Sequence, residues 1–268
     1  MKPLLIEHLR ELPDAFRRRS VTREFLQARI LLSLQDHGAF SNWAFVGGTA
    51  LRFLFNLPRY SEDLDFSLVS AGTDVRFEKL MRAVRGDLHA EAYTVEIKVR
   101  ADKTVASAMI KFRGLLHELG ISPLQDETIA VKVEIDTNPP QGAGTDIKAV
   151  RRYFMLNLQH YDAASLLAGK LHAVLSRKYT KGRDLYDLAW YLAAPAWPEP
   201  NIWLLDNALR QTSWQGDEVT LSNWRQIVAG KLDTLDWRAA LNDVSPFLER
   251  PEDAAWVTPE RLHRLLQA

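Results

Sequence analysis

The sequence contains no cysteine, which excludes disulfides, thiolate zinc sites and cysteine nucleophiles. Its seven histidines are scattered and never form the HExxH spacing of a zinc protease. It also lacks an excess of charge of either sign, because 34 Lys and Arg residues balance 34 Asp and Glu residues. Any contact with a polyanion must therefore depend on a local patch, and the available chemistry rests on carboxylates, lysine and arginine.

Long apolar runs are absent as well. No window approaches the ~20 apolar residues that a membrane-spanning helix needs. Residues 1–20 carry charges throughout and have no uninterrupted apolar core, which is not typical of a signal peptide. We therefore expect a cytoplasmic protein with no membrane partner. The 268 residues, 47% of them hydrophobic, are enough to bury one large core or two smaller ones.

Periodicity orders the first half of the chain as helix, strand, helix, strand, helix and then several strands. The predicted strands are 43–46, 63–68, 94–100, 105–112 and 129–136, and the predicted helices are 22–37, 49–55, 74–89, 162–179 and 184–194. After the loop 139–145 the composition shifts toward helix. We predict an α/β domain over residues 1–150 and a helical domain over residues 151–268, with a soft boundary near 138–160.

Two aspartates lie two residues apart on the predicted strand 63–68. Because side chains at this spacing point to one face, Asp63 and Asp65 present carboxylates about 7 Å apart. Like charges this close repel each other, and a hard cation with oxygen ligands relieves the repulsion. We expect Mg²⁺, with Mn²⁺ as the alternative. A third carboxylate from strand 129–136 would let the site hold two ions, and both Glu134 and Asp136 lie on the suitable face of that strand.

A Gly-Gly turn separates the strand 43–46 from the helix 49–55. Without side chains, Gly47 and Gly48 let the backbone approach a phosphate, toward which the helix directs its N–H groups and positive dipole end. Thr49 adds a hydroxyl. A Gly-Gly pair alone is more often only a turn, and an Asp-x-Asp alone is more often a solvated strand edge. In this order, with a further acidic strand, they predict a site for a nucleotide and a metal ion.

These motifs resemble those of the AbiEii/MenT nucleotidyltransferases, the toxin half of type IV toxin–antitoxin systems. The first motif covers Val46–Leu51 and Arg59–Ser67, the second Val131–Ile135, the third Leu166–Ala173 and the fourth Arg183–Leu188. The resemblance leaves the residues beyond 190 unexplained. It implies an α+β fold, in which the mixed sheet of the DNA-polymerase-β-like nucleotidyltransferases, with flanking helices, is followed by a mainly helical C-terminal region that completes the active site.

The resemblance also implies roles for individual residues. The metal ligands are Asp63, Asp65 and Glu134, with Glu134 favoured over Asp136; the nucleotide-binding residues are Gly47, Gly48, Thr49, Arg59, Ser61 and Lys170; and Asp187 belongs to the catalytic group with Asp63, Asp65, Glu134 and Lys170. The ammonium of Lys170 suits a triphosphate as a compact point charge. Two alternatives stay open. Arg59 either contacts phosphate or holds its loop through a carboxylate, and Asp184 is either a site residue or a helix start favoured by the dipole.

The acceptor is harder to predict, because the motifs describe the donor site. The basic clusters Arg151-Arg152 and Arg177-Lys178, the latter with Lys181 and Arg183, are candidates for an RNA backbone track, although a solvated helix face is the default. Seven of the eight tryptophans lie from Trp190 onward. Their irregular spacing favours packing over stacking on bases.

By resemblance, the chain transfers nucleotides from an NTP donor to an RNA acceptor, in the MenT branch the tRNA 3′ end, and thereby blocks translation and growth. The same resemblance implies a cognate antitoxin encoded next door. One alternative keeps the chemistry but uses a small molecule or a protein hydroxyl as the acceptor. Another is a non-catalytic, partner-binding member of the fold, against which the intact Asp63, Asp65 and Lys170 argue.

Overall fold

The computed structural model describes residues 2–179 and 181–267. These residues form two compact units. Unit 1 contains residues 2–55, 60–139 and 147–160, and unit 2 contains residues 56–59, 140–146 and the described part of 161–267.

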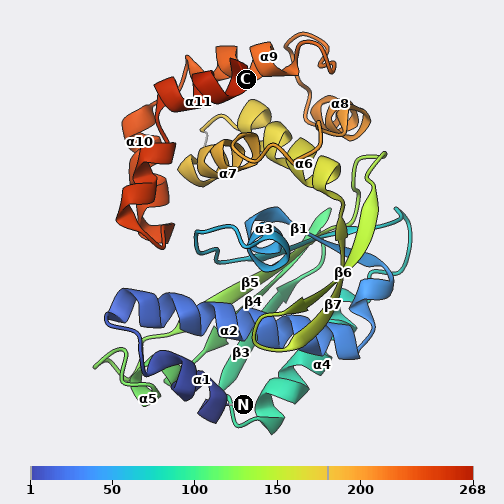
Figure 1. The fold of residues 1–268 in the computed structure, drawn as a ribbon. Coiled ribbons are helices and arrows are strands. Elements are labelled where there is room, and N and C mark those ends of the chain that lie inside the picture. Colours follow the sequence, from blue (N-terminus) through green and yellow to red (C-terminus); the bar gives the residue numbers. More distant parts are fainter. Residues whose placement is uncertain (1, 180, 268) are drawn as a thin grey trace. The chain divides into compact units, whose positions relative to one another are not determined.

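Unit 1 is built on a mixed sheet, which has seven strands in the described part of the chain (Figure 1). The strands are β1 (Trp43–Val46), β2 (Leu64–Leu68), β3 (Val95–Arg100), β4 (Val105–Phe112), β5 (Ile129–Asp136), β6 (Thr145–Arg151) and β7 (Met155–Tyr161). Their order across the sheet is β3-β4-β5-β2-β1-β7-β6. Strand β2 pairs antiparallel with β1 and parallel with β5. Strands β2 and β5, which carry the predicted metal ligands Asp65 and Glu134, therefore lie in the middle of the sheet.

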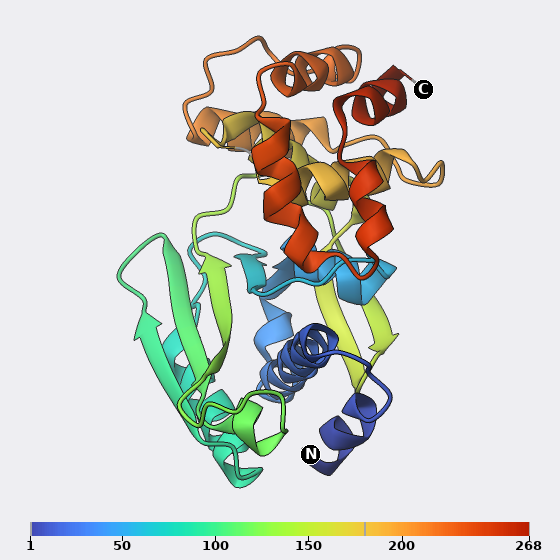
Figure 2. The ribbon, with the colours of Figure 1, turned by 90° about the vertical axis from the view of Figure 1, so that its left-hand side faces the viewer.

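Helices flank this sheet within unit 1; Figure 1 shows α2 lengthwise across the strands, and Figure 2 shows the same helix nearly end-on. They are α1 (Lys2–Leu9), α2 (Ala15–Asp36), α3 (Gly47–Phe55), α4 (Phe77–Ala90) and the short α5 (Leu115–Glu118), with a 3-10 turn at Ala39–Ser41. Helix α2 packs against β5 and α4. Its first turn is capped by Asp14, whose carboxylate accepts a 2.7 Å hydrogen bond from the backbone N–H of Arg17. This cap explains why the helix begins before its apolar periodicity does.

Unit 2 is mainly helical. It contains α6 (Ala163–Ser176), α7 (Gly182–Leu192), α8 (Ile202–Gln211), α9 (Trp224–Leu232), α10 (Trp237–Val244) and α11 (Pro259–Gln267), with 3-10 turns at Ser245–Phe247 and Pro251–Trp256. Helix α6 packs against α7, α8 and α9, and α7 packs against α10 and α11. The rings of Tyr191 and Trp197 lie 4.5 Å apart, and Trp224 is buried. The packing interpretation holds for Trp197 and Trp224, whereas Trp203 is 65% exposed.

The expected architecture, a mixed sheet with flanking helices followed by a helical C-terminal region, is confirmed. Strands β1, β4 and β5 have the predicted ends. Strands β6 and β7 were not predicted, and they lie between the predicted loop 139–145 and the predicted helix 162–179, which begins at Ala163. Strand β6 is exposed at almost every residue, so it lacks the alternation that would have predicted it. Within the described residues, no helix is long and apolar enough to cross a membrane.

Candidate active site

The central register of the sheet brings two of the predicted metal ligands together. In the parallel β2–β5 pair, Asp65 lies opposite Glu134, whereas Asp136 lies opposite Ser67. Neighbouring strands are about 4.8 Å apart, and paired residues of parallel strands point to the same face. The alternation of burial along β5 puts Glu134 on its half-exposed face, as Asp65 is on β2. The register therefore favours Glu134 over Asp136 as the partner of Asp65.

The glycine turn lies directly against Asp65. Gly47 has φ +78°, which side chains of L-residues rarely adopt. A Cβ atom at Gly47 would also be only 2.6 Å from Asp65 Oδ2. The turn and the carboxylate thus approach each other closely because residue 47 has no side chain. Helix α3 begins at this turn, so its N-terminal N–H groups are next to the carboxylate strand.

Polar contacts fix the segment that leads into β2. The buried hydroxyl of Thr49 donates a hydrogen bond to the backbone carbonyl of Asp63. Gln27 Nε2 donates to the carbonyl of Ser61 over 3.1 Å, and Arg23 pairs with Glu62 at 3.2 Å. Thr49 therefore acts on the position of Asp63 in this structure, and the contact of Ser61 is made through its backbone.

A buried charge cluster holds the far end of α3. Arg52 pairs with Glu24, and both side chains are almost fully buried. Glu24 also accepts hydrogen bonds from Arg152 (2.8 Å) and from the Tyr153 hydroxyl (2.7 Å). Burial alone would raise the pKa of Glu24, but Arg52 and Arg152 lower it overall. Arg152 thus has an internal carboxylate partner, which leaves Arg151 as the exposed member of the first basic cluster.

Lys132, which the sequence interpretation did not single out, lies among the predicted metal ligands. Its Nζ is 2.7 Å from Glu134 Oε1. The hydrogen bond to Glu134 raises the pKa of Lys132; burial lowers it, and the charges of Glu134, Asp63 and Asp65 raise it further. In the described part of the chain no three Asp, Glu or His side chains converge to hold an ion as they stand. The oxygen donors fit Mg²⁺ or Mn²⁺ in chemistry and strand placement, while the Glu134 carboxylate is turned to Lys132.

The remaining predicted site residues meet in unit 2. Arg59 forms a bidentate pair with Asp187, with Nε–Oδ1 and Nη2–Oδ2 distances of 2.6 Å. Arg59 is 2% exposed and Asp187 is fully buried. Of the two alternatives for Arg59, the structure shows the carboxylate contact. Planar, two-point pairing of this kind fixes both side chains firmly.

Lys170 joins this pair. Its Nζ lies 2.6 Å from Asp187 Oδ2 and 3.0 Å from Asp184 Oδ1, and Asp184 also pairs with Arg177. We call Arg59, Lys170, Arg177, Asp184 and Asp187 the α6–α7 charge cluster. Asp184 lies in the first turn of α7, as its helix-start interpretation required, and also belongs to the cluster.

Both members of the Lys170–Asp184 pair are stabilised in their charged forms. Burial alone would lower the pKa of Lys170, but Asp187 and Asp184 outweigh it and raise the pKa. Burial alone would raise the pKa of Asp184, but Lys170 and Arg177 lower it. Lys170 and Asp184 therefore stay ionised at neutral pH, and removal of one of them leaves a buried charge with fewer partners.

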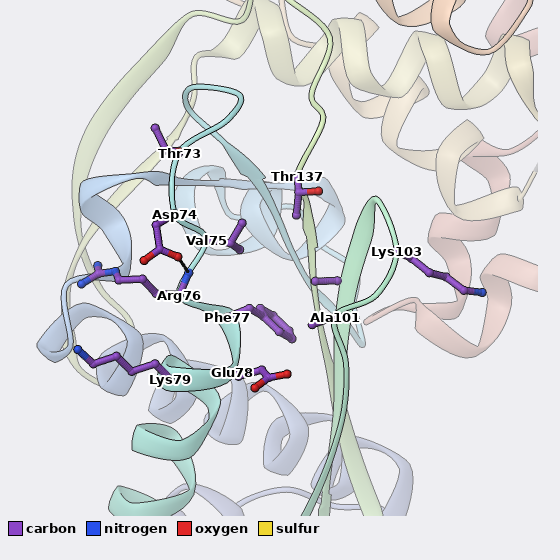
Figure 3. A pocket seen from close by; sticks show the side chains of 11 residues that line it. Thr73, Asp74, Val75, Arg76, Phe77, Glu78, Lys79, Ala101, Lys103 and Thr137 are labelled. Carbon is purple, nitrogen blue, oxygen red and sulfur yellow. Dashed lines mark hydrogen bonds between the residues drawn. The ribbon is translucent and has the colours of Figure 1, made fainter.

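A groove of about 500 Å³ in unit 1 lies elsewhere (Figure 3). It is lined by residues 73–79 together with Ala101, Lys103, Ala106 and Thr137. The carboxylate of Asp74 accepts a 3.0 Å hydrogen bond from the backbone of Arg76. Lys79 and Lys103 extend to opposite sides, so their charges do not converge (Figure 3). Because none of the predicted site residues in the described chain lines it, this groove is not the predicted active site.

Comparison of the sequence with known protein families identifies the family of this chain. The sequence profile of the nucleotidyl transferase AbiEii toxins of type IV toxin–antitoxin systems matches residues 29–259. The chain belongs to the AbiEii toxin family. This AbiEii-family chain is therefore a nucleotidyltransferase, and membership implies an NTP substrate and a cognate antitoxin. Nucleotidyltransferase families generally use divalent metal ions.

Two solved structures share the fold. MenT4, a nucleotidyltransferase toxin from Mycobacterium tuberculosis H37Rv, is 20% identical with a TM-score of 0.59; the match covers 99% of this chain and 88% of MenT4. JHP933 from Helicobacter pylori is 18% identical with a TM-score of 0.55, over 92% of this chain and 93% of JHP933. A search of the curated proteins gives no significant match. At these identities the likeness of the AbiEii-family chain to both structures concerns the fold alone.

Proposed function

We propose that this nucleotidyltransferase is a metal-dependent toxin that transfers nucleotides from an NTP to an RNA acceptor, the tRNA 3′ end. The observation that carries the proposal is the register of β2 and β5, which pairs Asp65 with Glu134 beside the Gly47 turn. Two carboxylates on adjacent central strands, next to a helix N-terminus, combine a cation site with a phosphate site.

In this proposal Asp63, Asp65 and Glu134 hold the divalent cation. The cation, Mg²⁺ or Mn²⁺, would supply activation of the attacking oxygen and neutralise the triphosphate and its leaving group. The backbone of Gly47 and Gly48 and the N-terminal N–H groups of α3 bind the phosphates. Thr49 sets the position of Asp63 through the hydrogen bond to its carbonyl.

The α6–α7 charge cluster supplies the cationic part of the proposal. An ammonium carries three N–H donors. Among the described residues, the partners of Lys170 are the carboxylates of Asp184 and Asp187, so a third donor is left for a triphosphate oxygen. Asp187 positions this ammonium and is itself held by Arg59. Ser61 remains a candidate phosphate contact.

The acceptor part of the proposal rests on the resemblance and on exposed basic residues. Tyr179 is 78% exposed, and the Lys178 ammonium lies 5.4 Å from its ring centre. An exposed aromatic ring beside a cation suits a single-stranded nucleic acid, which stacks its bases and pairs its phosphates. This pair favours RNA over a small molecule or a protein hydroxyl as the acceptor.

The biochemical test incubates the purified chain with each labelled NTP, Mg²⁺ and total RNA, and a gel then shows which species gains label. We expect label on tRNA with the wild-type chain and none with Asp65→Asn, which keeps the shape but removes a charge. Chelation of the metal should have the same effect as the substitution. An Asp65→Asn protein with near wild-type transfer would remove the carboxylate site from the proposal.

Expression in bacteria tests the toxin part. The wild-type chain without a partner should arrest growth, and the Asp63→Ala, Asp65→Ala double variant should not. Co-expression of the neighbouring gene should restore growth if it encodes the antitoxin. Arrest that survives the double substitution would mean that the harm comes from binding or aggregation. Absence of arrest, together with label on a protein or a small molecule, would favour the other acceptors.

A further inference from the structure

Lys132 lies close to the candidate metal ligands within unit 1. It precedes Glu134 by two residues on β5, so both side chains point to the same face, and its Nζ lies 2.7 Å from Glu134 Oε1. Leu64 lies opposite Val133, and continuing this register by one residue places Lys132 level with Asp63. Its charge also interacts with those of Asp63 and Asp65. One ammonium thus acts on all three carboxylates.

The position of Lys132 has a consequence for the Glu134 carboxylate. Among the described residues no three acidic or histidine side chains converge to hold an ion as they stand, and Glu134 is directed to Lys132. The side chains of Lys132 and Glu134 are 37% and 27% exposed. A half-exposed lysine on a flexible four-carbon stem can leave its partner and extend into solvent. Glu134 is then free to turn toward Asp65, its register partner.

We propose that Lys132 is a built-in counter-ion of the carboxylate site, which holds Glu134 while no metal is bound and is displaced by the arriving divalent cation. The proposal rests on the metal dependence proposed above and adds a residue that sets the metal affinity. Three carboxylates repel one another without a cation, and Lys132 reduces this repulsion in the metal-free protein. The same contact competes with the metal, because the cation must replace Lys132 at Glu134.

The chain offers a matched control for this lysine. Lys98 on β3 pairs with Glu96, two residues away on the same strand, at 3.3 Å. This pair has the same spacing and lies in the same sheet, but it belongs to the edge strand rather than to the carboxylate group. Lys98→Met therefore removes an ion pair of the same spacing without touching the candidate ligands, and Glu96 keeps Arg113 as a partner, whereas Lys132→Met removes the proposed counter-ion.

The test is a calorimetric titration of the nucleotide-free protein with MnCl₂, which needs no catalysis. Exposed ion pairs are individually weak. We expect Lys132→Met to bind Mn²⁺ about fivefold more tightly than the wild type, equivalent to ~1 kcal/mol. Lys98→Met should bind like the wild type, and Lys132→Arg, which keeps the charge, should stay within about twofold of it. With EDTA, Lys132→Met should melt at a lower temperature than Lys98→Met.

The outcomes separate this inference from the proposed function. Unchanged or weaker Mn²⁺ binding by Lys132→Met, with clear binding by the wild type, overturns the counter-ion but leaves the metal site intact. No Mn²⁺ binding by the wild type overturns both. If Lys132→Met does not fold, Lys132→Gln takes its place, with the same expected gain in affinity and the same refuting result.

Discussion

Two features of the turn require glycine at residue 47: the left-handed backbone conformation and the close approach of the Asp65 carboxylate. In Gly47→Ala the added Cβ would lie 2.6 Å from Asp65 Oδ2, so the carboxylate must move by about 0.8 Å to reach the 3.4 Å of an ordinary contact. The left-handed conformation of residue 47 costs a further ~1–2 kcal/mol once a Cβ is present. A misplacement of about 1 Å in an active site can reduce the rate ~100-fold. We expect Gly47→Ala to lose about two orders of magnitude in nucleotide transfer.

Gly72 provides the control, because it has the same φ of +78° but no atom within 4 Å of its added Cβ. Gly72→Ala should therefore carry the conformational cost, a fall of a few degrees in Tm, while transfer stays near the wild-type rate. Transfer is measured with labelled NTP and total RNA, and Tm by thermal melting in EDTA. Equal transfer by Gly47→Ala and Gly72→Ala would refute the argument that the bare backbone at residue 47 makes room for the Asp65 carboxylate.

The α6–α7 charge cluster gives two further predictions. Asp187→Asn leaves Arg59 and Lys170 buried with less compensating charge, so it should lower the free energy of unfolding by ~3–5 kcal/mol. The control Asp206→Asn, at a more exposed ion pair on α8, should lower it by less than ~1 kcal/mol. Urea titrations measure both losses, and equal losses would contradict the prediction. Because the pKa of Asp184 is lowered, its stabilisation is present above the unfolded pKa of ~3.9 and is lost as pH falls through the folded pKa. The difference in unfolding free energy between wild type and Asp184→Asn should thus be constant from about pH 5 to 8 and shrink below about pH 4, and a constant difference down to about pH 2 would rule this linkage out.

The sequence predicted best those parts of the fold where local pattern and burial agree. Strand β5 alternates buried and half-exposed residues without exception, and its predicted ends match the structure. Helix α2 was predicted to begin at Thr22 but begins at Ala15, because the Asp14 cap extends it through a polar turn. Polar side chains such as Glu24 and Gln27 are buried on it, and no periodicity of apolar residues reveals them.

For the candidate site, the spacing of residues along one strand predicted which side chains share a face, but the sequence did not predict which residues pair between distant segments. The two-residue spacing of Asp63 and Asp65 predicts that their carboxylates lie on one face of a strand. The choice between Glu134 and Asp136 needs the register of β2 and β5. The partner of Arg59 lies 128 residues away in the sequence, so the local pattern left its two alternatives equal. Lys132 was overlooked because a lysine on a half-exposed strand face is ordinary until its carboxylate neighbours are known.

The central place of β2 also matters while the chain is being synthesised. Its two neighbours in the sheet come from opposite directions in the sequence: β1 precedes it, whereas β5 ends only at Asp136. At about 5–20 residues per second, a ribosome needs about 3–14 s to add residues 69–136. During this interval the growing chain exposes one unpaired edge of β2, which invites aggregation or chaperone binding. Glu134, a proposed metal ligand, is not yet part of the chain during this interval, so we expect the nascent chain to be inactive until β5 has been added.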